Sequence, residues 1–121
     1  MIAALLVALG AAVGAPLRYL TDQWLRARRG AVFPWGTAVV NVTGSLLLGV
    51  LIGLPANDAV RLVVGTGVCG ALTTYSTFSY ETLRLVQTRA WRVAAASVLV
   101  NLGVGIGAAF AGVALAEAIV R

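Results

Sequence analysis

The residues best suited to chemistry lie in one decapeptide, Gly70-Ala71-Leu72-Thr73-Thr74-Tyr75-Ser76-Thr77-Phe78-Ser79. This stretch combines a glycine, hydroxyl side chains and aromatic rings, and it lies in an uncharged interval that is otherwise suited to lipid. Backbone and hydroxyl groups at that depth are costly unless they face protein, water or an ion. We therefore expect the function of the chain to depend on Gly70 to Ser79.

Charge is sparse along the chain, and its distribution predicts a membrane protein. Of the 121 residues, 11% are charged and 60% are hydrophobic, and the mean hydropathy is +0.96. A soluble domain carries about 25% charged residues. Four intervals have no charge: Met1 to Leu17, Gly30 to Asn57, Leu62 to Tyr80 and Val93 to Ala116. Because a helix crosses a bilayer core with roughly 17–20 residues, we expect one all-α integral membrane domain over residues 1–121, with spans at about 1–20, 34–54, 59–83 and 93–119.

The composition excludes several classes of function. The chain has no histidine, and its single cysteine, Cys69, lies in the third predicted span, where a small apolar side chain is the expected role. No Asp or Glu lies near the middle of a predicted span, which argues against carboxylate proton relays and two-carboxylate hydrolases. A small multidrug transporter also has four spans but needs a carboxylate in the first, and Met1 to Leu17 contains none. We expect no enzymatic activity.

The positive charge predicts membrane orientation rather than nucleic-acid binding. All nine basic residues are arginines, and they give a net charge of +5. In a four-span chain the first and third loops share one side of the bilayer, and both termini share the other with the second loop. Seven arginines belong to the first side and two to the second: Arg18, Arg26, Arg28, Arg29, Arg84, Arg89 and Arg92 against Arg61 and Arg121. We expect a multi-pass protein of the cell inner (plasma) membrane whose first and third loops are cytoplasmic.

Two predicted spans carry polar stripes. In residues 34–54, small or polar side chains recur every four residues and lie on one face of a helix: Asn41, Ser45, Gly49 and Gly53. This face is either a packing seam, with the asparagine bonded to a neighbouring helix, or the lining of a pore. Ser97 and Asn101 lie one turn apart in residues 93–119, and the same two interpretations apply to them.

The third predicted span, residues 59–83, is expected to be broken near its middle. Glycine costs about 1 kcal/mol in a helix interior, and three glycines crowd the first half of this span before Thr73-Thr74 adds two poor helix formers. We expect the interruption near Gly70 to Thr74, with carbonyl and N–H groups left without intrahelical partners. Broken helices at mid-membrane are a recurrent way to bind ions. The aromatic pair Tyr75 and Phe78 would indicate only core packing if it stood alone.

Four stretches carry a family resemblance: Gly14-Ala15-Pro16-Leu17-Arg18-Tyr19; Pro34-Trp35-Gly36-Thr37 leading to Asn41-Val42-Thr43-Gly44-Ser45; Gly70 to Phe78; and Glu81. On these residues the chain resembles the Fluc/CrcB fluoride channels along nearly its full length, and the third stretch is highly specific. The resemblance implies an antiparallel dimer with two pores along the subunit interface. Its implied function is to let cytoplasmic fluoride leave down its electrochemical gradient, which reduces fluoride toxicity.

The resemblance also implies which residues meet the ions. The fluoride path maps to Asn41, Tyr75, Ser76, Thr77 and Phe78, and we expect Asn101 on the same path. A sodium ion at the dimer centre would bind the main-chain carbonyls of Gly70 and Thr73. Amide N–H and hydroxyl O–H groups can donate to fluoride, and aromatic ring edges are electropositive. The chain departs from the family pattern at Tyr75, where phenylalanine is usual, and at Ser97, where many members have tyrosine.

The charge bias leaves the nature of the dimer open. A homodimer of oppositely oriented copies needs a chain that inserts both ways, hence a nearly balanced arginine distribution. Seven arginines against two instead predict a heterodimer with a homologous subunit of opposite bias. Pairing of the chain with itself remains the alternative, as does a subunit whose pores conduct only in part or not at all.

Overall fold

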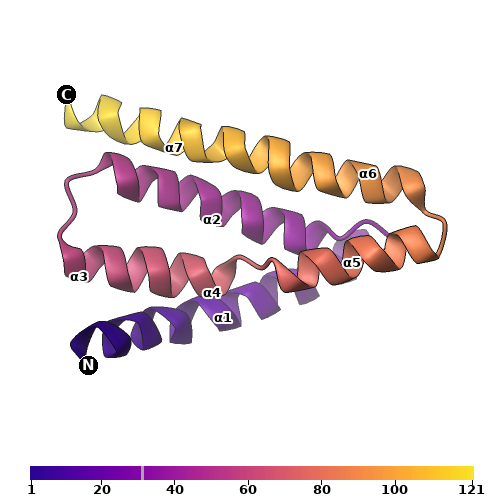
Figure 1. Ribbon diagram of the computed structural model, residues 1–121, viewed down its shortest axis with the longest axis horizontal. Helices are drawn as coiled ribbons and strands as arrows, with labels where there is room; N and C mark the ends of the chain where they lie inside the picture. The colour runs from indigo at the N-terminus through magenta and orange to yellow at the C-terminus, as the bar shows by residue number, and fades with distance from the viewer. Residues whose placement is uncertain (31) are drawn as a thin grey trace.

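A computed structural model describes residues 1–30 and 32–121, and within these ranges the chain forms helices and connecting segments only (Figure 1). The helices run side by side along one long axis, and the N terminus, the C terminus and the α2–α3 connection lie at the same end (Figure 1). In chain order they are α1 (Ile2–Arg29), α2 (Trp35–Gly53), α3 (Asp58–Val60), the π-helical η1 (Arg61–Cys69), α4 (Gly70–Leu72), α5 (Ser76–Gln87), α6 (Trp91–Leu99), the π-helical η2 (Val100–Val104) and α7 (Gly105–Val120).

In the part of the chain that the structure describes, three helical stretches are long and apolar enough to cross a membrane: Ile2–Arg29, Trp35–Gly53 and Trp91–Val120, the last made of α6, η2 and α7. A further helical stretch joins α3, η1 and α4 without a gap, and α5 follows after three non-helical residues. The prediction of an all-helical chain is confirmed, and three of the four predicted spans are helices of membrane-spanning length and composition.

Helix α1 is longer than the sequence predicts. The first span is predicted to end at about residue 20, whereas the helix continues to Arg29. Within this extension Arg26 Nε lies 3.1 Å from Asp22 Oδ2, an i,i+4 ion pair that supports the last turns. Three arginines lie in the last turn, where the helix dipole favours cations. The helix ends at Gly30, whose φ of 79° is a conformation that glycine adopts without steric cost.

Glycines allow α1 to approach the third helical stretch closely. A methyl group at Gly10 would overlap the carbonyl oxygen of Val63 and would lie 2.8 Å from the Cα of Gly67. One turn later, a methyl group at Gly14 would lie 3.1 Å from the Cβ of Ala71. Small residues four apart commonly permit such contacts in membrane proteins. The two glycines therefore fix α1 against η1 and α4.

Helices α2 and α7 are joined by a second seam of small residues. A methyl group at Gly49 would lie 2.9 Å from the carbonyl carbon of Ala109, and one at Gly112 would lie 2.7 Å from the backbone nitrogen of Val50. In both places the obstacle is backbone rather than a flexible side chain. The C-terminal half of the predicted stripe on α2 is thus a packing seam.

Substitution of Gly49 by valine is expected to destabilise the fold. Overpacking a close contact costs about 1–3 kcal/mol, and the backbone of Ala109 cannot turn aside. The unfolding midpoint in detergent should therefore fall clearly below that of the unmodified protein. Gly107→Val is the matched control, because a methyl group at Gly107 meets no atom within 4 Å. Equal midpoints for the two variants would contradict this packing.

Candidate functional site

Thr73, Thr74 and Tyr75 separate α4 from α5 (Figure 1). The backbone of Thr73 is extended, with φ −76° and ψ 160°, whereas Gly70 is helical, with φ −63° and ψ −38°. The prediction that Gly70 belongs to the interruption is therefore wrong. The threonines end the helix instead, because short polar side chains compete with helical hydrogen bonds; the Thr73 hydroxyl donates to the carbonyl of Cys69 at 2.8 Å.

Asn41 of α2 holds this segment through its side-chain amide. Its Oδ1 accepts a hydrogen bond from the Thr74 N–H at 2.8 Å, and its Nδ2 donates to the Thr74 carbonyl at 3.2 Å. Nδ2 also donates to Oδ1 of Asn101 at 2.7 Å. One side chain therefore pairs both main-chain groups of Thr74 and reaches a second helix.

Asn101 lies in the π-helical turn η2, a kind of turn that is frequent at functional sites. Its Nδ2 donates to the Ser97 carbonyl at 2.8 Å and lies 3.5 Å from the Ser97 hydroxyl oxygen. Ser97 is fully buried. Because the Asn101 amide nitrogen faces a carbonyl, its oxygen must face Asn41, so the two amides fix each other's orientation.

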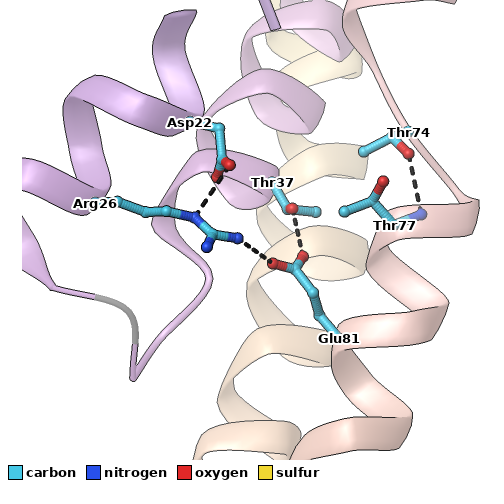
Figure 2. A network of polar contacts seen from close by, with 6 residues as sticks. All are labelled: Asp22, Arg26, Thr37, Thr74, Thr77 and Glu81. Carbon is cyan, nitrogen blue, oxygen red and sulfur yellow. Dashed lines mark hydrogen bonds and ion pairs between the residues drawn. The ribbon is translucent and has the colours of Figure 1, made fainter. Parts of the chain in front are cut away.

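The Thr74 hydroxyl caps the first turn of α5. It accepts a hydrogen bond from the Thr77 N–H at 3.1 Å (Figure 2), and Thr74 is buried. From the sequence Thr74 is expected only to weaken the helix, with no role in binding either ion. The signal that could have found it is the Thr74-x-x-Thr77 spacing, since a threonine hydroxyl typically accepts from the N–H three residues later at a helix N-terminus.

These bonds deprive two main-chain carbonyls of their helical donors. In a continuous α-helix the N–H of residue i+4 donates to the carbonyl of residue i, so Thr74 would donate to Gly70 and Thr77 to Thr73. The Thr74 N–H donates to Asn41 instead, and the Thr77 N–H donates to the Thr74 hydroxyl. Among the described residues, the carbonyls of Gly70 and Thr73 therefore receive no backbone hydrogen bond. Carbonyls in this position need another partner.

A pocket of about 370 Å³ opens beside the interruption. It contains four of the six predicted fluoride-path residues and both residues predicted to bind sodium through their carbonyls. Its lining is Asn41, Gly44, Ser45, Leu48, Gly65, Cys69, Gly70, Thr73, Thr74, Tyr75, Phe78, Asn101 and Leu102. The N-terminal half of the stripe on α2, Asn41 and Ser45, thus faces a pocket rather than a seam.

Ser76 and Thr77 do not join this pocket. Ser76 is exposed, and Thr77 lines a separate pocket of about 170 Å³ with Arg18, Thr37 and Thr74. Thr77 also lines a groove of about 460 Å³ at the end of the bundle, which Arg26 and Arg84 border. Residues three apart on a helix share a face and adjacent residues do not, so α5 turns Ser76 and Thr77 away from Phe78.

A polar network at the end of the bundle joins α1, α2 and α5 (Figure 2). The hydroxyl of Thr37, which is buried, donates to Oε1 of Glu81. Arg26 lies 4.0 Å from Oε2 of the same carboxylate and also pairs with Asp22. The family resemblance includes Thr37 and Glu81 but gives neither a role. The structure shows that their hydrogen bond connects α2 to α5.

The pocket beside the interruption offers donors and acceptors but no charged side chain. Amide and hydroxyl donors and the ring of Phe78 suit an anion, whereas the two carbonyls suit a cation. Residues 1–30 and 32–121 contain no cluster of three or more His, Cys, Asp or Glu side chains that could hold a metal ion. A cation bound here would therefore use neutral oxygens, such as main-chain carbonyls.

Known proteins are similar to this chain along almost its whole length. The family model described as CrcB-like protein, Camphor Resistance (CrcB), matches residues 5–113. The Fluoride-specific ion channel FluC 1 of Streptomyces avermitilis is 57% identical over 119 residues, which cover 95% of this chain and 96% of the relative. The proteins of the same name from Frankia casuarinae and Thermobifida fusca are 54% identical over 124 residues and 52% over 111; these cover 95% and 92% of this chain and 96% and 92% of the relatives. The chain therefore belongs to the Fluc/CrcB family, a family of membrane ion channels and not of enzymes.

Proposed function

We propose that this chain is a subunit of a fluoride-selective channel that exports cytoplasmic fluoride passively. The observation that carries the proposal is the uncharged pocket in which Asn41, Tyr75, Phe78 and Asn101 meet beside the interrupted helix. The relatives that are 52–57% identical carry the name fluoride-specific ion channel. Hydrogen fluoride enters a cell as a neutral acid and releases fluoride in a less acidic cytoplasm, so a passive channel is enough to reduce toxicity.

The pocket suits fluoride because the ion holds its water tightly and a pore must replace that water with donors. The hydroxyls of Tyr75, Ser76 and Thr77 and the ring edge of Phe78 are the donors that we assign to the path. Asn41 and Asn101 also belong to it, as lining residues whose amide hydrogens are bonded within the protein. No arginine lines the 370 Å³ pocket, which favours weak binding and release, as conduction requires.

The groove at the end of the bundle is the entrance that we assign to cytoplasmic fluoride. Arg26 and Arg84 border it, and Thr77 lines both this groove and the separate pocket of about 170 Å³. The lining of the groove also contains Glu81, and Arg26 pairs with that carboxylate and with Asp22, so Arg84 supplies the excess positive charge. Positive charge at an entrance raises the local concentration of an anion, and the uncharged pocket receives the ion afterwards.

The proposal includes an antiparallel dimer in which α3 to α5 cross the membrane together as one broken span. Tyr75 is 82% exposed although it lies midway along an apolar bundle, and a methyl group at Gly70 would meet nothing within 4 Å. A second subunit packed on this face would cover the phenol ring and would explain a glycine that the chain's own packing does not require.

Sodium at the dimer centre belongs to the same proposal. The carbonyls of Gly70 and Thr73 lack helical donors, and both residues line one pocket. Freed carbonyls at a broken helix are typical ligands for this ion. Two carbonyls from each subunit would supply four oxygens. The sodium ion would tie the two interruptions together and would add positive charge between the two fluoride paths.

Fluoride efflux from proteoliposomes tests the channel function. We expect selective release of fluoride over chloride when the chain is reconstituted with the partner that completes its dimer. Phe78→Ile should reduce the fluoride rate at least about tenfold, because it removes a ring edge from the pocket. Phe110→Ile is the matched control, since Phe110 lies on α7 and is 73% exposed. Absence of fluoride-selective flux, alone and with a homologous partner, would end the proposal.

A second candidate is a subunit whose dimer conducts through one pore only. Tyr75 favours it, because a hydroxyl stands where the family usually has the apolar edge of phenylalanine, and this residue lines the pocket. Recordings of single channels distinguish the two cases. Two equal, independent conductance levels indicate two working pores, and a second level that appears only in Tyr75→Phe indicates that the hydroxyl closes one.

A further inference from the structure

We propose that the side chains of Asn41 and Thr74 form a main-chain latch, which keeps the carbonyls of Gly70 and Thr73 available to the sodium ion. In this role both are positioning residues for the cation, and Asn41 acts on the cation site as well as on the fluoride path. The inference rests on the proposed function, and it adds Thr74, to which the resemblance gives no task.

The first half of the latch acts on Gly70. The Thr74 N–H donates to Asn41 Oδ1 at 2.8 Å. A buried N–H that loses its acceptor is costly and takes the nearest substitute. For Thr74 the helical substitute is the carbonyl of Gly70, four residues earlier. Asn41 therefore prevents α4 from adding one more helical bond at the expense of a cation ligand.

The second half acts on Thr73 by the same logic. The Thr77 N–H donates to the Thr74 hydroxyl at 3.1 Å. Without this hydroxyl, the helical acceptor for Thr77 is the carbonyl of Thr73. Helix α5 would then extend backwards, and the second cation ligand would be consumed. Two side-chain bonds thus protect the two carbonyls separately.

Asn101 fixes the orientation of the Asn41 side-chain amide. Its Nδ2 faces the Ser97 carbonyl at 2.8 Å, which can only accept. Its oxygen must then receive the Nδ2 of Asn41, at 2.7 Å. This leaves the oxygen of Asn41 directed at the Thr74 N–H. A reversed Asn41 amide would place two oxygens together at Asn101 and would release Thr74.

Sodium-dependent stability of the purified channel tests the inference without any measurement of flux. A ligand that binds only the folded protein raises the unfolding midpoint as its concentration increases. We would titrate sodium chloride against N-methylglucamine chloride at constant ionic strength. We call the sodium concentration that gives half of the midpoint shift the half-point. It should rise about tenfold or more in Thr74→Val, which keeps the shape of the side chain and removes the hydroxyl. Thr74→Ser, which restores the hydroxyl, should return to the unmodified value.

Thr82→Val is the matched control. Its hydroxyl donates to the Phe78 carbonyl at 2.8 Å within α5 and touches neither carbonyl of the cation site. The half-point in this variant should stay unchanged. Asn101→Leu supplies an independent variant, because it should raise the half-point by loosening Asn41 while Thr74 is intact.

Three outcomes would overturn the latch: an unchanged half-point in Thr74→Val, an equal rise in Thr82→Val, or no sodium dependence in the unmodified channel. The last of these, together with fluoride efflux, would leave the fluoride-channel function intact but would end the sodium part of the proposal. If sodium stabilises the protein in a way that depends on Thr74, but the protein transports no fluoride, the latch is supported and the channel proposal fails.

Discussion

Replacement of Asn41 by aspartate is expected to reduce fluoride flux by at least about 100-fold. A carboxylate cannot donate, so the oxygen that replaces Nδ2 would face both the Thr74 carbonyl and Oδ1 of Asn101, to which Nδ2 now donates. Each broken contact of this kind costs about 1–3 kcal/mol, and about 1.4 kcal/mol corresponds to a factor of ten. A negative charge in the pocket would also repel the anion. The measurement is the initial rate of fluoride efflux per reconstituted channel.

Asn57→Asp is the matched control for this prediction. Asn57 caps α3 in an exposed position, where its Oδ1 accepts from the Val60 N–H at 2.9 Å. Aspartate retains that acceptor and is an equally good cap, so flux should be unchanged. A rate for Asn41→Asp within a few-fold of the unmodified channel would show that the amide neither lines the path nor holds the interrupted segment.

The stripe on α2 illustrates how much of the fold periodicity can predict. The i+4 spacing placed Asn41, Ser45, Gly49 and Gly53 on one face and left two interpretations open. The structure divides them: Asn41 and Ser45 line the pocket, whereas Gly49 and Gly53 pack against α7. Periodicity identifies a face but not the neighbour that covers it. The neighbour depends on how the helices cross.

Residues 73–75 are not helical, whereas the sequence predicts an interruption near Gly70 to Thr74 and attributes it to glycine. Glycine propensity is a weak prior that tertiary contacts override, and Gly70 is helical. The stronger cause is Asn41, which takes the Thr74 N–H from 33 residues away. No local window of sequence contains that bond. The same limit applies to α1, whose extension to Arg29 depends partly on an ion pair rather than on apolar periodicity.

The candidate site was predicted in part as well. The resemblance identified three residues that line one pocket, and the polar pair of the last span added Asn101, but the resemblance grouped Ser76 and Thr77 with them, although α5 directs these two elsewhere. It passed over Thr74, whose three polar groups are all hydrogen-bonded to neighbours. A motif records which residues occur together, whereas the direction of each side chain is set by the turn of the helix.

The arginine distribution favours one orientation of the chain in the membrane. The structure places the C-terminal end of α1, with Arg26, Arg28 and Arg29 in its last turn, at the end of the bundle that also holds the α5–α6 connection, opposite both termini (Figure 1). Arg28 and Arg29 stack on Trp24 and Trp35 at 4.7 and 5.2 Å from the ring centroids, an arrangement that suits a membrane interface. An inverted copy would have to move seven arginines across the bilayer instead of two.

We therefore expect reporters fused to the C-terminus to give an external signal at least about ten times the cytoplasmic one, because basic loops stay inside. Fluoride flux should then require a homologous subunit of opposite bias, since copies that all face one way cannot form an antiparallel pair. Neutralising Arg28, Arg29, Arg89 and Arg92 with glutamine changes the bias from seven against two to three against two, and should produce both orientations. Equal signals from the unmodified chain, with full flux in the absence of a partner, would instead establish a homodimer. The interface at Tyr75 and Gly70 would then be formed with the same residues of a second copy.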